Sequence, residues 1–261
     1  MSEPRAVVGC HRLDGHVALV TLNRPEVRNA VNGELAQGLE AIVLDTEADP
    51  EVWAVVLTGA GHGVFCAGAD LKEVSAGRGE QLFTARGGFA GFVYAERRKP
   101  WIAAVNGKAL AGGCEIVLAC DLVVASDDAA FGLPEVTRGL IAAAGGLIRL
   151  PRALPRNLAL ELAMTGDPMD VRRAEMHGLV NRVVPAGQVV DEALVLARRI
   201  NRNAPLAVRE SLQIARVAAE LSEADARALT LAARERVMRS EDYKEGPLAF
   251  IEKRAPHWTG R

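Results

Sequence analysis

The sequence lacks several features that would assign a chain to a functional class at once. Its formal net charge is only −2 over 261 residues, so nothing global indicates a nucleic-acid partner or an acidic membrane surface. The longest apolar region, 101–125, is interrupted by Lys108, Glu115 and Asp121, which argues against a membrane span. The first ten residues carry charges and have no apolar core, so we expect no signal peptide and a cytoplasmic protein.

Metal and nucleophile motifs are missing as well. The four cysteines form no Cys-x-x-Cys pair, which favours a reducing compartment without a disulfide framework. The five histidines have no ligand spacing, so we expect no metal, and no Gly-x-Ser-x-Gly elbow is present. The glycine-rich segment 59–63 fails as a dinucleotide loop because Val64 stands where the third glycine belongs, and we interpret it as a turn.

The hydrophobic pattern predicts an α/β chain with a helical C-terminal part. A helix capped by Asn32 is expected to run to about Ala48, and buried strands are expected at 17–22, 52–58, 101–105 and 121–126. This strand–helix order favours buried strands joined by crossover helices. From Val189 onward only helices are expected, at about 189–202, 205–220, 223–239 and 241–253, which indicates a separate layer or an assembly arm.

The most informative stretch is 109–121. Small residues and two glycines, Gly112 and Gly113, precede an apolar run that is typical of a buried helix. The first N–H groups of a helix attract negative charge, and a glycine leaves its own N–H uncovered, so this position offers a donor to an oxyanion. Glu115 lies in the first turn and is a candidate acid or base, although a lone glutamate there also suits the helix dipole.

Two further segments offer complementary groups. The small residues of 65–69 lead to Asp70, which can cap a short helix, so a second backbone donor is expected near Ala69, with a plain structural turn as the alternative. Residues 75–91 are rich in glycine and charge and are expected to form a mobile loop with a helix in it, suited to shaping a pocket. Glu135 follows Pro134 and is a second candidate carboxylate, although a solvated turn residue is more typical there.

Two backbone donors, near Ala69 and Gly112, and two carboxylates, Glu115 and Glu135, suit one type of reaction. Paired donors polarise a thioester carbonyl and stabilise the enolate that forms when the neighbouring carbon gains or loses a proton, each contributing roughly 3 kcal/mol. Two neighbouring carboxyls hold their pKa values apart, so one accepts a proton while the other donates. The combination suits the addition of water to a double bond conjugated with a carbonyl.

Together these segments resemble the crotonase family, the enoyl-CoA hydratase/isomerase superfamily, over nearly the whole chain. Residues 65–72 resemble its first oxyanion and CoA-binding segment, 104–115 resemble the second, and 133–135 resemble its second-carboxylate motif. The resemblance implies a crotonase-like ββα-spiral core over 1–195 and an all-helical trimerisation region over 196–261, in a homotrimer or a hexamer built as a dimer of trimers. It implies an acyl-CoA thioester substrate with coenzyme A as its carrier, no other cofactor, and neither a nucleic-acid nor a membrane partner.

The resemblance also implies a role for each site residue. The amides of Ala69 and Gly112 would bind the thioester oxygen, Glu115 would act as the general base on water, and Glu135 would exchange a proton at the α-carbon. The positions that would bind coenzyme A are Arg28, Ala67, Asp70, Leu71, Phe250 and Lys253, of which the last two would reach the CoA of a neighbouring subunit.

Both glutamates are present, which favours an enoyl-CoA hydratase, adding water reversibly to a 2-enoyl-CoA. Several short segments, among them 87–91, 149–151 and 240–254, look like carnitinyl-CoA dehydratases (crotonobetainyl-CoA hydratases), so that activity is the alternative, with a non-catalytic CoA-binding scaffold as a third hypothesis. Many hydratases have Pro-Gly-Ala before the last two glycines of the acyl-pocket loop, whereas 142–144 here is Ala-Ala-Ala. This departure leaves the acyl specificity open.

Overall fold

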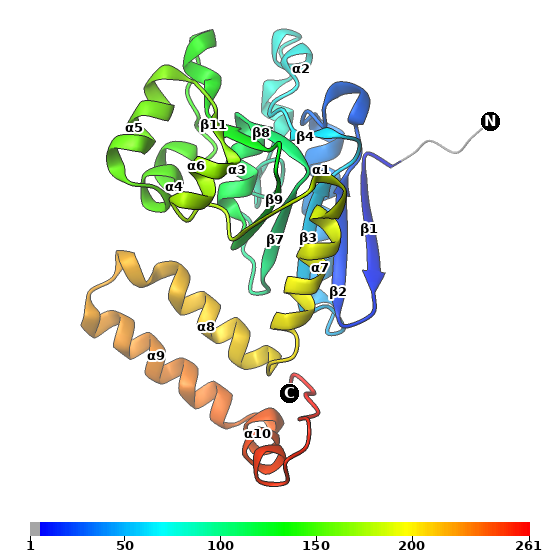
Figure 1. Cartoon of the computed structure of the whole chain (residues 1–261), viewed down its shortest axis with the longest axis vertical. Coiled ribbons are helices and arrows are strands. Elements are labelled where there is room, and N and C mark those ends of the chain that lie inside the picture. The colour runs from blue at the N-terminus through cyan, green and yellow to red at the C-terminus, as the bar shows by residue number, and fades with distance from the viewer. Residues whose placement is uncertain (1–5) are drawn as a thin grey trace, which may run out of the picture.

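A six-stranded sheet forms the centre of the chain, whose computed structural model describes residues 6–261 (Figure 1). Its first two strands form an antiparallel hairpin, and every other neighbouring pair is parallel. In order across the sheet the strands are β1 (Val8–Leu13), β2 (Val17–Leu22), β3 (Ala54–Gly59), β7 (Trp101–Val105), β9 (Leu122–Ser126) and β12 (Arg182–Val184).

A second sheet of four short strands lies beside the first. Three of these strands each follow a long one in the chain, so that β3 leads to β4, β7 to β8 and β9 to β10, and a helical segment comes next each time. This is the ββα repeat that the family resemblance implied. The order of the second sheet is β11 (Met169–Asp170), β10 (Ala130–Gly132), β8 (Gly107–Leu110) and β4 (Gly63–Cys66), and a separate hairpin joins β5 (Phe83–Thr84) to β6 (Gly88–Phe89).

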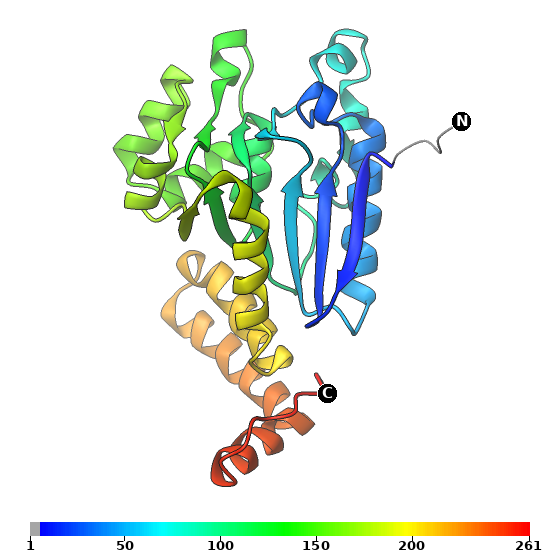
Figure 2. The ribbon, with the colours of Figure 1, turned by 45° about the vertical axis from the view of Figure 1, so that its right-hand side comes forward.

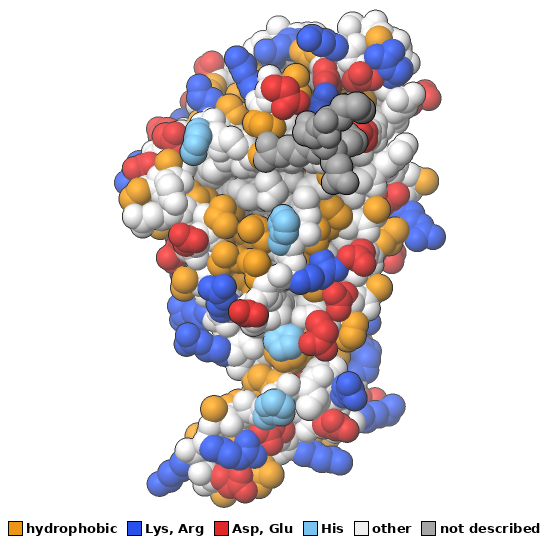
Figure 3. All heavy atoms as spheres, turned by 90° about the vertical axis from the view of Figure 1, so that its right-hand side faces the viewer, with side chains coloured by type: hydrophobic (Ala, Val, Ile, Leu, Met, Phe, Trp, Pro, Cys, Tyr) orange, Lys and Arg blue, Asp and Glu red, His pale blue; other side chains and the backbone are white. Residues whose placement is uncertain are grey.

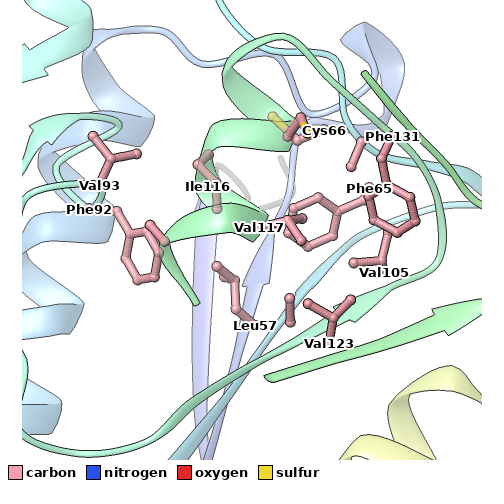
Figure 4. Packing of buried hydrophobic residues seen from close by; sticks show 14 of the residues in the cluster. Leu57, Phe65, Cys66, Phe92, Val93, Val105, Ile116, Val117, Val123 and Phe131 are labelled. Atoms are coloured by element: carbon pink, nitrogen blue, oxygen red, sulfur yellow. The ribbon is translucent and has the colours of Figure 1, made fainter. Parts of the chain in front are cut away.

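Helices cover both faces of the large sheet (Figures 1 and 2). Alternate residues of a strand point to opposite faces, and accordingly Val55 and Leu57 of β3 belong to the main core while Ala54 and Val56 pack against α7 (Val189–Ile200). The main core also contains residues of α1 (Gly33–Ala48) and α3 (Gly112–Ala119). Figure 4 shows Ile116 and Val117 of α3 among side chains of both sheets, so α3 is wedged into the apolar centre of the molecule.

The remaining helices form two groups. Four surround the small sheet: α2 (Leu71–Ser75), α4 (Gly146–Ala153), α5 (Arg156–Thr165) and α6 (Val171–Met176). Three form an arm that extends away from the core: α8 (Pro205–Val217), α9 (Glu223–Met238) and α10 (Glu241–Ile251) (Figure 2). The arm is fastened by Arg216, whose guanidinium donates to both carboxylate oxygens of Asp121 at 2.7 and 2.8 Å. On the face seen in Figure 3, a narrow waist separates core from arm, and basic and acidic side chains are interspersed.

Most of the sequence-based elements are confirmed. The side chain of Asn32 accepts a hydrogen bond from the Leu35 amide at 2.9 Å and caps α1, which ends at Ala48 as expected. The segment 75–91, expected as a loop with a helix in it, contains a 3-10 turn at Gly79–Leu82 and the β5–β6 hairpin. Strand β1 was missed because its outer positions carry the exposed polar side chains of His11 and Arg12. The boundary at 195/196 stays a prediction, and it falls within α7.

Candidate active site

A cavity of about 620 Å³ lies at the junction of α2, the β5–β6 hairpin, α3 and the segment 134–144. Its lining is largely apolar. It contains seven of the ten predicted site residues: Arg28, Ala67, Ala69, Leu71, Gly112, Glu115 and Glu135. The fold therefore brings both predicted donors and both predicted carboxylates to one place.

The two donor segments pass each other in direct contact. A Cβ at Gly68 would lie 2.8 Å from the amide nitrogen of Gly112, so only glycine allows the backbones to come so close. On the Ala69 side, the Gly68 carbonyl accepts from the Val31 amide at 2.8 Å, and the Asp70 amide donates to the Val31 carbonyl at 2.9 Å. These bonds fix the peptides on both sides of Ala69, while the Ala69 amide itself has no hydrogen-bond partner within residues 6–261.

The Gly112 amide is held in a similar way. Gly112 is the first residue of α3, where an amide has no acceptor inside the helix. The preceding residue, Ala111, has a φ of +52°, a strained conformation for alanine, and its amide donates to the Gly132 carbonyl at 2.9 Å. A Cβ at Gly112 would lie 2.4 Å from the ring of Phe89, so a side chain cannot enter here. Two amides without an acceptor among residues 6–261 thus border the same cavity, as the predicted oxyanion hole requires.

Glu115 lies one turn into α3 and is only 3% exposed. Its Oε1 atom accepts a hydrogen bond from the Gly146 amide at 2.8 Å. Burial raises the pKa of Glu115 to about 7, and the negative charge of Glu135 adds to this rise, while the Gly146 amide opposes it. A carboxyl group with this pKa exchanges protons readily near neutral pH.

Glu135 comes from the 3-10 turn Pro134–Arg138 and is partly buried. One of its carboxylate oxygens is buried without a hydrogen-bond partner among the residues that the structure describes. Burial raises the pKa of Glu135, and the positive charge of Arg138 opposes this rise. An unpartnered, partly desolvated carboxyl facing the same cavity as Glu115 is available to a bound molecule.

Three predicted CoA-binding residues lie outside this cavity. Asp70 is buried, its Oδ2 accepts two hydrogen bonds from Arg24 at 3.1 Å, and its Oδ1 caps α2 at the Lys72 amide. These hydrogen bonds hold the residue that follows Ala69 in place. Phe250 and Lys253 lie at the far end of the arm, and Phe250 is 85% exposed, so their predicted contact with a neighbouring subunit's CoA stays a prediction.

Several lining residues were not individually predicted. The sequence marked 75–91 as pocket-shaping, and that region supplies Gly79, Leu82, Phe83 and Phe89. It gave no signal for the amide of Gly146 as a partner of Glu115, because the two residues belong to different helices and are 31 positions apart. Within residues 6–261, no cluster of three His, Cys, Asp or Glu side chains could hold a metal ion, and no helix is long and apolar enough to cross a membrane.

Comparison with known proteins identifies the family. The family model described as enoyl-CoA hydratase/isomerase matches residues 12–261. The chain belongs to this family. A solved enoyl-CoA hydratase from Mycobacterium tuberculosis H37Rv is 42% identical, covers 98% of this chain and 100% of its own, and superimposes with a TM-score of 0.94, which establishes the crotonase fold.

Relatives of this family member carry two different names. Carnitinyl-CoA dehydratase of Proteus mirabilis is 40% identical over 252 residues, which are 95% of this chain and 96% of that protein. A solved carnitinyl-CoA hydratase from Mycobacterium avium is 48% identical, covers 99% of this chain and 100% of its own, and has a TM-score of 0.76. Identity to enoyl-CoA and carnitinyl-CoA enzymes is thus similar, so the comparisons fix the family and leave the acyl group open.

Proposed function

We propose that this family member is an enoyl-CoA hydratase, a hydro-lyase that adds water reversibly to a 2-enoyl-CoA. The observation that carries the proposal is the convergence of the Ala69 and Gly112 amides with Glu115 and Glu135 on one cavity. Amides aimed at a developing oxyanion, together with two carboxyls of raised pKa, suit a reaction that passes through a thioester enolate.

The proposed steps assign each carboxyl one proton-transfer role. Ionised Glu115 accepts a proton from water as the water oxygen bonds to the β-carbon of the enoyl group. The electrons of the double bond move toward the thioester oxygen, where the amides of Ala69 and Gly112 stabilise the enolate. Protonated Glu135 then donates to the α-carbon, and a proton passes back from Glu115 to Glu135 to restore the starting state.

The lining of the cavity favours a neutral acyl chain. Apart from the two glutamates, its charged side chains are Arg28 and Arg138, and the side chains of Leu82, Leu140 and Ile141 are apolar. An alkyl group gains about 25 cal/mol for each Å² that it buries against such a surface. A trimethylammonium group, which crotonobetainyl-CoA carries, would have to lose water beside an arginine, and this is unfavourable unless another group compensates it.

One observation supports carnitinyl-CoA dehydratase as the second candidate, besides the similarity to proteins of that name. Phe83 and Phe89 both line the cavity, and their rings meet edge to face with centroids 5.5 Å apart. Aromatic faces bind quaternary ammonium groups through cation–π attraction of about 0.5–2 kcal/mol. This pair is the compensation that a trimethylammonium group would need.

We further infer a homotrimer or a dimer of trimers, acting in the cytoplasm, in which Phe250 and Lys253 contact the CoA of a neighbouring subunit. The support is the exposure of apolar side chains along the arm, including Phe250 and Ile251, which a partner would cover. Light scattering gives the assembly state, and cell fractionation gives the location. Mixing a Glu115→Gln chain with a Phe250→Ala/Lys253→Ala chain tests the shared site, because activity then returns only in mixed assemblies.

The deciding experiment follows the loss of conjugated-thioester absorbance with crotonyl-CoA and crotonobetainyl-CoA in parallel. Faster turnover of crotonyl-CoA supports the hydratase, and preference for crotonobetainyl-CoA supports the second candidate. Glu115→Gln and Glu135→Gln should each lower turnover by about 10²- to 10⁴-fold with CoA binding intact. CoA binding without turnover of either thioester, unchanged in both variants, would instead indicate a non-catalytic scaffold.

A further inference from the structure

Arg149 of α4 connects two parts of the chain behind the candidate base. Its Nη2 atom donates to the Val93 carbonyl at 2.6 Å, and its Nη1 atom donates to the Ala144 carbonyl at 3.4 Å. The guanidinium carbon lies 5.1 Å from the centroid of the Tyr94 ring. Arg149 is partly buried, so these contacts are shielded from solvent. The side chain thus ties segment 93–94 to the start of α4.

The guanidinium also packs directly on the turn that precedes α4. Gly145 has a φ of +99°, and a Cβ added there would lie 2.1 Å from the Arg149 Nη1 atom. The Arg149 amide donates to the Gly145 carbonyl at 2.8 Å, so backbone and side chain hold the same turn. The next residue is Gly146, whose amide donates to Glu115. A shift of this turn would therefore move the amide that donates to the Glu115 carboxylate at 2.8 Å.

The positive charge of Arg149 also acts on Glu115. The groups that influence the Glu115 carboxyl are Glu135, which raises its pKa, and the amides of Gly146 and Ala144 together with Arg149, which lower it. Arg149 is the only cation in this set. Its positive charge favours the ionised form of Glu115, which is the form that a general base needs.

We propose that Arg149 is a positioning residue for Glu115, clamping the 144–146 turn so that the Gly146 amide meets the carboxylate, and stabilising the ionised carboxylate by its charge. This inference rests on the proposed role of Glu115 as the general base. Arg149 does not line the candidate active-site cavity, and it borders a second cavity of about 570 Å³.

The chain offers a matched control on the same helix. Arg152 lies three residues further along α4 and borders the same second cavity, but it forms an ion pair with Glu220 of the 3-10 turn Ala218–Glu220. It makes no hydrogen bond to the 144–146 turn. If Arg149 and Arg152 only stabilise the fold, replacing either of them should change activity to a similar extent, and neither substitution should change the pH dependence of kcat/KM.

The test compares the pH profiles of kcat/KM for Arg149→Met, Arg149→Lys and Arg152→Met with that of the wild type. Methionine keeps part of the aliphatic stem without the charge, and we expect the acid limb to move up by about 0.5 pH unit, which alone lowers kcat/KM about threefold on that limb, together with a lower plateau because the turn is no longer clamped. Lysine keeps the positive charge but cannot donate from two guanidinium nitrogens to Val93 and Ala144. In Arg149→Lys the acid limb of kcat/KM should therefore return towards its wild-type position, while the plateau stays below that of the wild type. Arg152→Met should retain the wild-type limb and plateau. If Arg149→Met does not fold, Arg149→Gln replaces it.

A second readout does not depend on catalysis. The infrared carbonyl band of protonated Glu115, assigned by its loss in Glu115→Gln, is titrated without substrate in the same variants. An upward shift in Arg149→Met that lysine reverses supports the inference, even if neither thioester is hydrated and the proposed function fails. An Arg149→Met band that titrates as in the wild type overturns the inference, even in an active hydratase. A pH profile that is only scaled down, without displacement of its limb, also overturns it.

Discussion

Gly146→Ala is the substitution that most directly tests how Glu115 is held. The new Cβ would lie 3.0 Å from both Cγ and Oε1 of Glu115 and 3.0 Å from Cδ1 of Leu133, which is too close without movement. The carboxylate must then move away from the Gly146 amide that it accepts from at 2.8 Å. A hydrogen bond to a charged group contributes about 1.5–3 kcal/mol, so kcat/KM should fall by about 10- to 150-fold.

The assay is hydration of the preferred enoyl thioester, with CoA affinity and thermal stability measured on the same preparations. Alanine stabilises a helix relative to glycine by about 1 kcal/mol, and this gain offsets part of the steric cost. The variant should therefore still fold. Gly187→Ala is the matched control, because nothing lies within 4 Å of a Cβ at Gly187. If Gly146→Ala keeps activity within twofold of the wild type, the Gly146–Glu115 bond does not position the base. If activity falls only as far as CoA affinity does, the reasoning also fails.

Three further outcomes are expected. The pKa of Glu115 is raised from 4.5 to about 7, so the wild type loses stability as pH rises through this window. Relative to the wild type, Glu115→Gln should therefore gain about 3 kcal/mol in unfolding free energy above pH 7 and nothing below pH 4.5. Urea unfolding at fixed protein concentration measures this difference. Arg24→Met leaves Asp70 buried and unpaired and should cost about 3–5 kcal/mol in the same assay, whereas an unchanged midpoint would show that the pair is dispensable. Gly112→Ala should lower kcat/KM at least 100-fold, because the new Cβ would lie 2.4 Å from the Phe89 ring. Adding Phe89→Ala to the same chain should recover part of this loss. If the losses in kcat/KM of the two single variants simply add in the double variant, the steric explanation is wrong.

The sequence predicted local structure well wherever a local interaction fixes it. Asn32 caps α1 through the Leu35 amide, and Asp70 caps α2 through the Lys72 amide, both as expected from residue type and position. The CoA-binding role of Asp70 came instead from the family resemblance, and the structure directs that carboxylate to Arg24. A capping preference depends on a few neighbouring atoms, whereas a ligand contact depends on the whole surrounding fold.

The residue pattern predicted that Ala69, Gly112, Glu115 and Glu135 act together, but it did not show the strand pairing that brings them to one cavity. Glu115 and Glu135 meet because β8 and β10 are parallel neighbours, with Leu110 paired to Gly132 just before α3 and the 3-10 turn begin. The strands of the β5–β6 hairpin have two residues each, which is too short to show the alternation that predicts a strand. The contact between Phe89 and Gly112 was therefore not predicted.

The start of α3 concentrates the features that lower the stability of this fold. Ala111 has a positive φ, which costs about 1–3 kcal/mol, and Glu115 is a buried carboxyl four residues later. One helical turn nevertheless supplies both the Gly112 amide and the candidate base Glu115 at a fixed separation, because helix geometry sets the positions of the first N–H groups and of the side chains of that turn. The second carboxyl has no such constraint and comes from another segment. The spacing of donor and base is therefore visible in the sequence, while the proximity of Glu135, which the sequence offers as the second carboxylate, is fixed only by the pairing of β8 with β10.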